Sequence, residues 1–208
     1  MNNKGFTLTE LLVAMGLSVV IMASVGAIYY QQQKSFLVQD QLAGAQQNVR
    51  AAMYFMERDI RSAGCDPTKK INPAPGIQTA SPNTISFTTD PDGNGTTETI
   101  TYSLDTADDQ IERNNQPLAE NIDALNFVYL DGAFPPAVLD DDGSGNVVAS
   151  RPLIRSVQVT VVAKTGRADP GYTDTRSYTN LRGETILGVQ NDKFRRRTLS
   201  TTIACRNL

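Results

Sequence analysis

The 208-residue chain contains no histidine and only two cysteines. The lack of histidine excludes a histidine-based catalytic triad and any histidine-ligated metal site within this chain. The formal net charge is −3, so the chain also lacks the overall basic excess that is typical of nucleic-acid-binding proteins. The sequence shows no nucleophile–base pair, phosphate-binding loop or metal-ligand cluster. These absences predict a protein that is not an enzyme.

Charge, proline and asparagine are absent from residues 11–30. At about 1.5 Å rise per residue, a helix of this length spans the ~30 Å hydrocarbon core of a bilayer. A cleaved secretory signal has a shorter apolar core and then a small-residue cleavage site, and neither is present. We therefore predict a retained membrane helix. Glu10 lies at its start, where a carboxylate needs a partner, and an amine on a neighbouring copy is the expected one.

The residues before the apolar run resemble a known processing motif. The stretch KGFTLTE (residues 4–10) is similar to the N-terminus of a type IV prepilin or a type II secretion pseudopilin. This resemblance implies that a prepilin peptidase cuts after Gly5 and that the new N-terminal Phe6 is N-methylated. It also implies that Glu10 and Phe6 act in docking the subunit into a filament. An ordinary signal anchor is the alternative, and it leaves Glu10 unexplained.

The helical pattern continues beyond the apolar run, and the first proline after it is Pro67. Apolar residues then recur at steps of three or four, which predicts one buried helix face. That face consists of Leu42, Ala45, Val49, Met53, Met56, Ile60 and Ala63. The residues expected on the opposite, solvent-facing side are Gln46, Gln47, Arg50, Glu57, Asp59 and Arg61. Gly64 is the predicted C-cap.

From residue 84 onward the hydrophobic period changes to two, which predicts β-strands. The predicted strands are 84–89, 97–104, 110–113, 124–130, 153–165 and 193–208. The first two flank the turn-forming sequence DPDGNG and should form a hairpin. Residues 117–122 are predicted to form a short helical turn. The polar, glycine-rich residues 166–192 are predicted to form a mobile surface loop.

These elements predict an α+β fold in which a long N-terminal α-helix packs on an antiparallel β-sheet head. Its parts are a leader (1–5), a transmembrane and assembly helix (6–30), an amphipathic helix half (31–64) and a β-rich globular head (65–208). The head resembles the minor pilin of the PilW type and its type II secretion counterpart, the J-type pseudopilin. The residues that carry this resemblance are MYFMERDIRSAGC (53–65), ITYSL (100–104), IERN (111–114), LAENIDALNFVYLD (118–131) and IRSVQVTVVAKT (154–165).

The resemblance implies a pilin fold and a minor pilin that helps to initiate assembly of a type IV pilus. Its implied partners are prepilin peptidase, other minor and major pilins, the inner-membrane assembly platform and membrane lipid. The implied location is the bacterial inner membrane, with a periplasmic head, and then the pilus at the cell surface. The closest alternative is a J-type minor pseudopilin of type II secretion. An alternative of another class is a tip adhesin or DNA-uptake binding module.

The one strong basic run, Lys193 with Arg195–Arg197, bears on that last alternative. In an alternating strand, Arg196 points away from its two neighbours, so the run does not form a continuous patch. We therefore interpret it as a solvated guard of an edge strand. The sequence gives no strong signal for nucleic acid.

The two cysteines, Cys65 and Cys205, lie at the ends of predicted segments. In an oxidising compartment paired cysteines usually form a disulfide. This one would close a loop of about 140 residues, which the chain-entropy treatment values at ~4–5 kcal/mol. We favour the disulfide, and two free buried thiols are the alternative.

An acidic turn provides the candidate metal site. Asp90, Asp92 and Asn94 fit the first half of a calcium-loop motif, and Glu98 falls at its ninth position. The twelfth position, where the motif needs a bidentate glutamate, is Thr101. We therefore predict no cofactor. Ca²⁺ is kept as a candidate beside ordinary Asp/Asn/Gly turn chemistry, which we favour.

Overall fold

The computed structural model describes residue 5 and residues 7–208, and these contain one long helix followed by strands. The elements are α1 (Leu8–Ser62), β1 (Ile77–Ala80), β2 (Thr84–Thr89), β3 (Glu98–Asp105), β4 (Gln110–Arg113), β5 (Gln116–Glu120), β6 (Ile122–Leu130), β7 (Val138–Leu139), the 3-10 helix η1 (Arg151–Leu153), β8 (Ser156–Lys164), β9 (Tyr178–Thr179), β10 (Thr185–Leu187) and β11 (Arg196–Ala204). The chain divides into two compact units, of which the first ends at Asp40 and the second is Gln41–Leu208.

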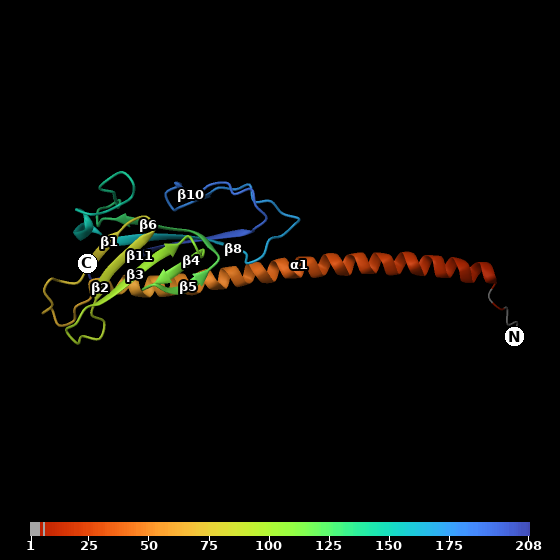
Figure 1. Ribbon diagram of the computed structural model, residues 1–208, viewed down its shortest axis with the longest axis horizontal. Helices are drawn as coiled ribbons and strands as arrows, with labels where there is room; N and C mark the ends of the chain where they lie inside the picture. Colours follow the sequence, from red (N-terminus) through yellow and green to blue (C-terminus); the bar gives the residue numbers. More distant parts are fainter. Residues whose placement is uncertain (1–4, 6) are drawn as a thin grey trace. The chain divides into compact units, whose positions relative to one another are not determined.

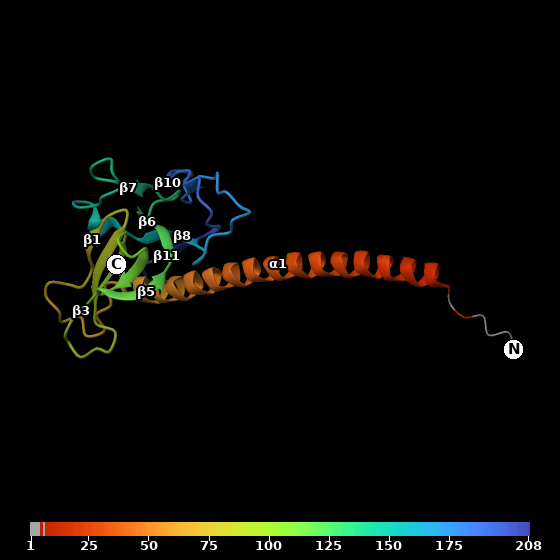
Figure 2. The same cartoon turned by 45° about the vertical axis from the view of Figure 1, so that its right-hand side comes forward.

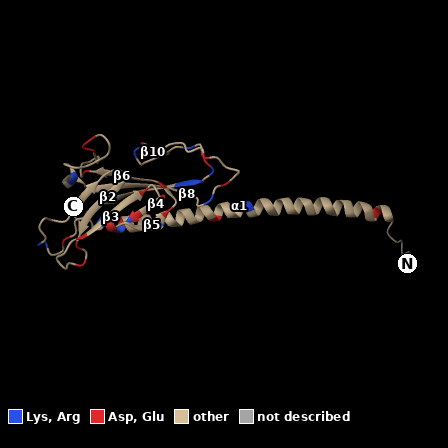
Figure 3. Ribbon diagram, viewed as in Figure 1, with Lys and Arg blue, Asp and Glu red and all other residues tan. Residues whose placement is uncertain are grey.

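The first unit consists of the N-terminal part of α1. From Leu8 to Asp40 every side chain is exposed except that of Val38, which is half-buried. The helix carries no charged residue between Glu10 and Lys34, and Figure 3 shows this uncharged stretch. By length and composition, α1 is able to cross a membrane. Residues 11–30 of α1 therefore present an uncharged and largely apolar surface.

The second unit begins with the last turns of α1, which have one buried face. Val49, Met53, Met56 and Ile60 are at most 5 % exposed, as the three-to-four spacing predicts. The helix ends at Ser62, and Gly64, two residues later, has a φ of +79°, the left-handed conformation that glycine adopts readily after a helix C-terminus. These apolar side chains join one core with residues from both large sheets. Each fully buried side chain of this size contributes roughly 1.5–3 kcal/mol to folding.

Two antiparallel sheets share that core. The first has five strands in the order β1-β2-β3-β4-β5, and the second has four in the order β11-β8-β6-β7. The views in Figures 1 and 2 agree that the sheets lie beside the C-terminal part of α1. Register pairs Phe127 with Val159 and Tyr129 with Val157, so these alternating side chains meet on the core face. The predicted α+β fold, with its antiparallel sheet on a long helix, is confirmed.

The predicted hairpin at residues 84–104 is present as β2 and β3. The predicted helical turn at residues 117–122 is wrong, because Gln116–Glu120 forms β5 and pairs with β4. The two strands are joined by Asn114 and Asn115, both with positive φ. That conformation is typical of a type I′ hairpin turn, and adjacent asparagines favour it. The asparagine pair was the local signal for this hairpin.

The predicted mobile loop at residues 166–192 contains β9 and β10, which form a small antiparallel sheet. Tyr178 of β9 is buried against Ala124 and Val162, and Ile186 and Leu187 of β10 pack on the same cluster. The segment therefore covers the face of the β6–β8 pair that points away from the main core. A polar, glycine-rich composition did not reveal these apolar contacts.

Candidate functional site

The N-terminal end of α1 holds the residues expected to act in processing and assembly. Gly5 is exposed, and Phe6 lies outside the described residues. Thr7 precedes the helix and caps it: its backbone N–H and its Oγ1 donate to Glu10 Oε2 at 2.9 and 2.8 Å. The backbone N–H of Glu10 approaches Thr7 Oγ1 at 3.3 Å in return. This reciprocal pattern is a capping box.

The capping box changes the interpretation of Glu10. The sequence led us to expect a partner only on another copy, but Thr7 supplies one within the subunit. A threonine followed three residues later by glutamate was the signal that could have shown it. Glu10 is exposed. The carboxylate therefore has a local hydrogen-bond partner and remains available to a cation from outside.

In the head, Asp59 joins α1 to the five-stranded sheet. It was expected to face solvent, but it is only 4 % exposed, so that prediction is wrong. Its Oδ2 accepts hydrogen bonds from Tyr102 Oη and Arg113 Nε, both at 2.8 Å. Burial and the hydrogen bond to the carboxylate both raise the pKa of Tyr102. Tyr102 is therefore a neutral donor at ordinary pH, and the cluster connects helix to sheet.

A second buried charge cluster lies at the start of β11. Arg196 is 4 % exposed and therefore is not the solvated residue that the sequence predicted. Its Nε donates to Asp123 at 2.5 Å, its Nη2 to Asp192 at 2.6 Å and its Nη1 to Asp174 at 3.1 Å. Asp123 belongs to β6, whereas Asp174 and Asp192 belong to segment 166–192. The arginine thus fixes that segment to the four-stranded sheet.

For two carboxylates of this cluster, Asp174 and Asp192, hydrogen bonds outweigh the effect of burial on the pKa. Burial acts to raise the pKa of Asp174, but hydrogen bonds from Tyr178, Arg196 and Arg176 lower it to about 2. The pKa of Asp192 is lowered first of all by its hydrogen bond with Arg196. Asp174 and Asp192 are therefore charged near neutral pH, and both are paired with Arg196. The cluster is therefore arranged for stability and not for proton transfer.

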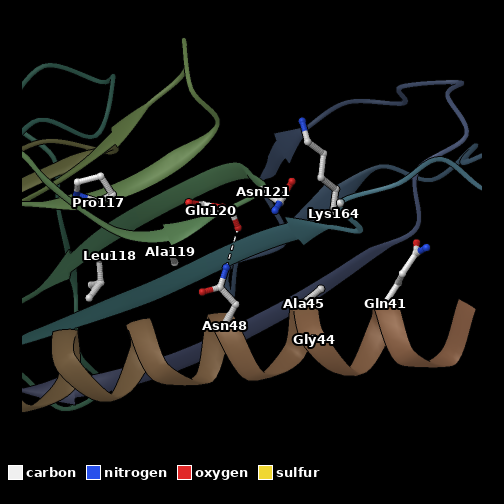
Figure 4. A pocket seen from close by; sticks show the side chains of 11 residues that line it. Gln41, Gly44, Ala45, Asn48, Pro117, Leu118, Ala119, Glu120, Asn121 and Lys164 are labelled. Carbon is white, nitrogen blue, oxygen red and sulfur yellow. Dashed lines mark hydrogen bonds between the residues drawn. The ribbon is translucent and has the colours of Figure 1, made fainter. Parts of the chain in front are cut away.

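A groove of about 460 Å³ lies between α1 and the sheet edges. Figure 4 shows Gln41, Gly44, Ala45 and Asn48 on the helix side. Asn48 Nδ2 donates to the backbone oxygen of Glu120 at 2.8 Å. The one lysine at its rim, Lys164, is bound to Asp109 and Asp123 at 2.6 and 2.8 Å. The groove is therefore a seam between helix and sheet, and its one lysine is already paired.

In the acidic turn at residues 90–95, the carboxylates accept hydrogen bonds from amides of the same turn. Asp90 Oδ1 accepts from the backbone N–H of Gly93 at 2.9 Å, and its Oδ2 accepts from Gly95 at 3.0 Å. Asp92 accepts from the backbone and side-chain amides of Asn94 at 3.2 and 2.9 Å. Within the described residues, no group of three or more His, Cys, Asp or Glu side chains is placed to hold a metal. The geometry is that of Asx turns.

The two cysteines are free thiols in the structure, so the predicted disulfide is not present in it. Cys205 is buried, and burial raises the pKa of its thiol to about 11, whereas Cys65 is half-buried. Their chain neighbours do meet, because Asn207 Nδ2 donates to the backbone oxygen of Arg61 at 3.1 Å. The C-terminal residues therefore lie against the end of α1.

Comparison with known proteins gives two sequence-family matches and one structural similarity. Residues 90–207 match the family described as type IV pilus-assembly protein W, and residues 1–26 match the prokaryotic N-terminal methylation motif. The fold is similar to that of a type IV-like pilin from Thermus thermophilus, with a TM-score of 0.54 and 13 % identity. That similarity covers 78 % of this chain and 97 % of the other. None of the curated protein sequences shows significant similarity to the chain.

Proposed function

Because the chain belongs to the type IV pilus-assembly protein W family, we propose that it is a minor pilin that helps to initiate assembly of a type IV pilus. The N-terminal methylation motif and the apolar part of α1 are consistent with membrane anchoring of a pilin. We place the head in the periplasm, because Lys4 then stays on the cytoplasmic side in accord with the positive-inside rule. The role we propose is structural, as the fold and the family are, and includes no catalysis.

The observation that carries the proposal is the position of Glu10. It lies one residue before an uncharged helical stretch, where an unpaired carboxylate is costly. We propose that prepilin peptidase cuts after Gly5 and that the freed, methylated amine of Phe6 becomes a cation at the membrane edge. The Glu10 of one subunit then pairs with the amine of another, and Thr7 holds the carboxylate in place until it does so.

Two substitutions separate the charge of Glu10 from its capping role. Glutamine is competent at the third helical position of a capping box, so Glu10→Gln keeps the cap and removes only the charge. Glu10→Ala removes both. We expect both variants to be cleaved normally and to be equally impaired in incorporation into pili, as measured by immunoblotting of sheared filaments. Normal incorporation of Glu10→Gln would refute the charge-pairing mechanism.

A separate measurement tests whether the chain is processed as a prepilin. The mature protein should begin at methylated Phe6, as determined by N-terminal sequencing and intact mass. Retention of Met1, or a cut beyond Tyr30, would contradict the proposal. Gene neighbourhood distinguishes the remaining alternatives: pilus minor subunits support the pilus role, and secretion genes support a J-type pseudopilin.

A further inference from the structure

The outer edge of the four-stranded sheet is an unpaired strand. β11 is nine residues long and pairs only with β8. At the two ends of this ladder, Thr165 N–H donates to the oxygen of Arg195, and Cys205 N–H donates to the oxygen of Arg155. Because pairing alternates in an antiparallel ladder, odd-numbered residues of β11 direct their backbone groups toward β8. The even-numbered residues direct theirs to the free edge.

Those free backbone groups lie along Thr198, Ser200, Thr202 and Ala204. Within residues 5 and 7–208, none of their backbone N–H or C=O groups has a hydrogen-bond partner. Proteins usually protect a long edge with charge, proline, a bulge or a covering segment. The register of β11 on β8 is continuous, without a bulge, and these four residues include no charge and no proline. The strand is therefore open to pairing with another chain.

A groove of about 270 Å³ runs beside this edge, between β11 and α1. It is lined by Arg50 and Arg197, with Val49 and Leu199 as the apolar part, and includes no acidic residue. Both arginines are exposed, and neither has an acidic partner among the described residues. In contrast, the guanidinium group of the adjacent Arg196 is paired with three carboxylates. The groove thus offers two free guanidinium groups beside free backbone groups.

We propose that β11 accepts an extended, acidic segment of a neighbouring subunit as an added strand. The backbone of that segment pairs with the even-numbered residues of β11, and its carboxylates pair with Arg50 and Arg197. This proposal rests on the proposed minor-pilin function, because that function makes the partner another pilin subunit. It adds the chemistry of the partner: an extended segment that carries carboxylates. Two features favour a peptide over nucleic acid: the apolar side chains in the groove and the unpaired N–H and C=O groups, which a phosphate backbone cannot match.

The test uses the full chain in detergent micelles and a fluorescent synthetic peptide of alternating glutamate and valine. We expect saturable binding by fluorescence anisotropy, and slower hydrogen exchange at Thr198, Ser200 and Thr202 in the bound state. The double variant Arg50→Ala/Arg197→Ala should bind about fivefold to tenfold more weakly, since it loses two exposed ion pairs. The same peptide with alternate amides N-methylated keeps its charge but cannot donate to β11, and it should not bind.

The matched control is Lys70→Ala/Arg206→Ala, which removes the same charge at exposed positions outside the groove. It should bind the peptide as the parent chain does. Equal weakening by both double variants, binding of the N-methylated peptide, or no saturable binding would each overturn the proposal. A DNA duplex that binds more tightly and is released by the Arg50→Ala/Arg197→Ala change would assign the groove to nucleic acid instead. None of these results depends on cleavage or on Glu10, so the proposed function is tested separately.

Discussion

Removal of the Arg196 side chain tests whether one buried cation holds segment 166–192 on the sheet. In Arg196→Met, the carboxylates of Asp123, Asp174 and Asp192 lose their shared donor. The side chain of Asp174 is completely buried, so its charge would be left without its main cation. Removing one partner of a buried ion pair typically costs about 3–5 kcal/mol. For a domain of this size, that corresponds to a fall in Tm of roughly 6–20 °C.

The assay is thermal unfolding of the full chain in micelles, followed by circular dichroism, together with hydrogen exchange of residues 166–192. The control is Arg197→Met, which truncates a neighbouring exposed arginine with no described acidic partner and should stay within about 0.5 kcal/mol. Loss of exchange protection confined to residues 166–192 would show that the segment detaches while the core stays folded. Equal stability of the two variants, with unchanged protection in both, would refute the reasoning.

The pH dependence of stability tests the role of the Arg196 cluster independently, and the direction of the change can be predicted. The pKa of Asp174 is about 2 in the folded chain, against an ordinary value of 3.8. A carboxyl with a depressed folded pKa stabilises the fold above its unfolded pKa and loses that contribution as pH falls through its folded pKa. The parent should therefore lose stability between about pH 4 and pH 2. Arg196→Met should lose less over this range, because protonation relieves its unpaired carboxylates; an identical loss in both chains would contradict this.

Two further predictions concern the acidic turn and the cysteines. Since Asp90 and Asp92 already bind the amides of their own turn, the Tm of the full chain should be the same in EGTA and in millimolar Ca²⁺; a rise with Ca²⁺ that Asp92→Asn abolishes would establish a metal site. We propose that Cys65 and Cys205 form a disulfide in the exported protein, since the C-terminus lies against the end of α1. Iodoacetamide should then add no mass to the denatured, unreduced chain, and labelling of both thiols would contradict the pairing.

Local patterns were sufficient to predict most secondary structure. The uncharged run, the three-to-four spacing along α1 and the cap at Gly64 each depend on residues that are close in sequence. The alternation in β6 and β8 likewise predicted which side chains form the core, because side chains of a strand point to opposite faces by geometry. Among the strands that were not predicted, β5 pairs with β4 through a two-residue turn whose asparagines carried the relevant signal.

Within the N-terminal site, the sequence alone supplied Gly5, Phe6 and Glu10. It also held the Thr7–Glu10 capping box, which spans three residues and needs no tertiary contact. The same reasoning could not find the free edge of β11, because strand order in a sheet is not encoded in the period of any one strand. The order is fixed by pairing between strands: β8 pairs with β6, and β11 pairs with the other edge of β8.

The sequence by itself determined where the helix runs, which of its faces is apolar and how the chain begins. Only the tertiary structure decided which charged side chains are buried. Asp59 and Arg196 each lie where local rules predict solvent, yet both are buried, because their partners come from segments distant in the chain. A charge leaves water only when groups of opposite charge are brought to it, and the packing of the head, not local propensity, brings them there.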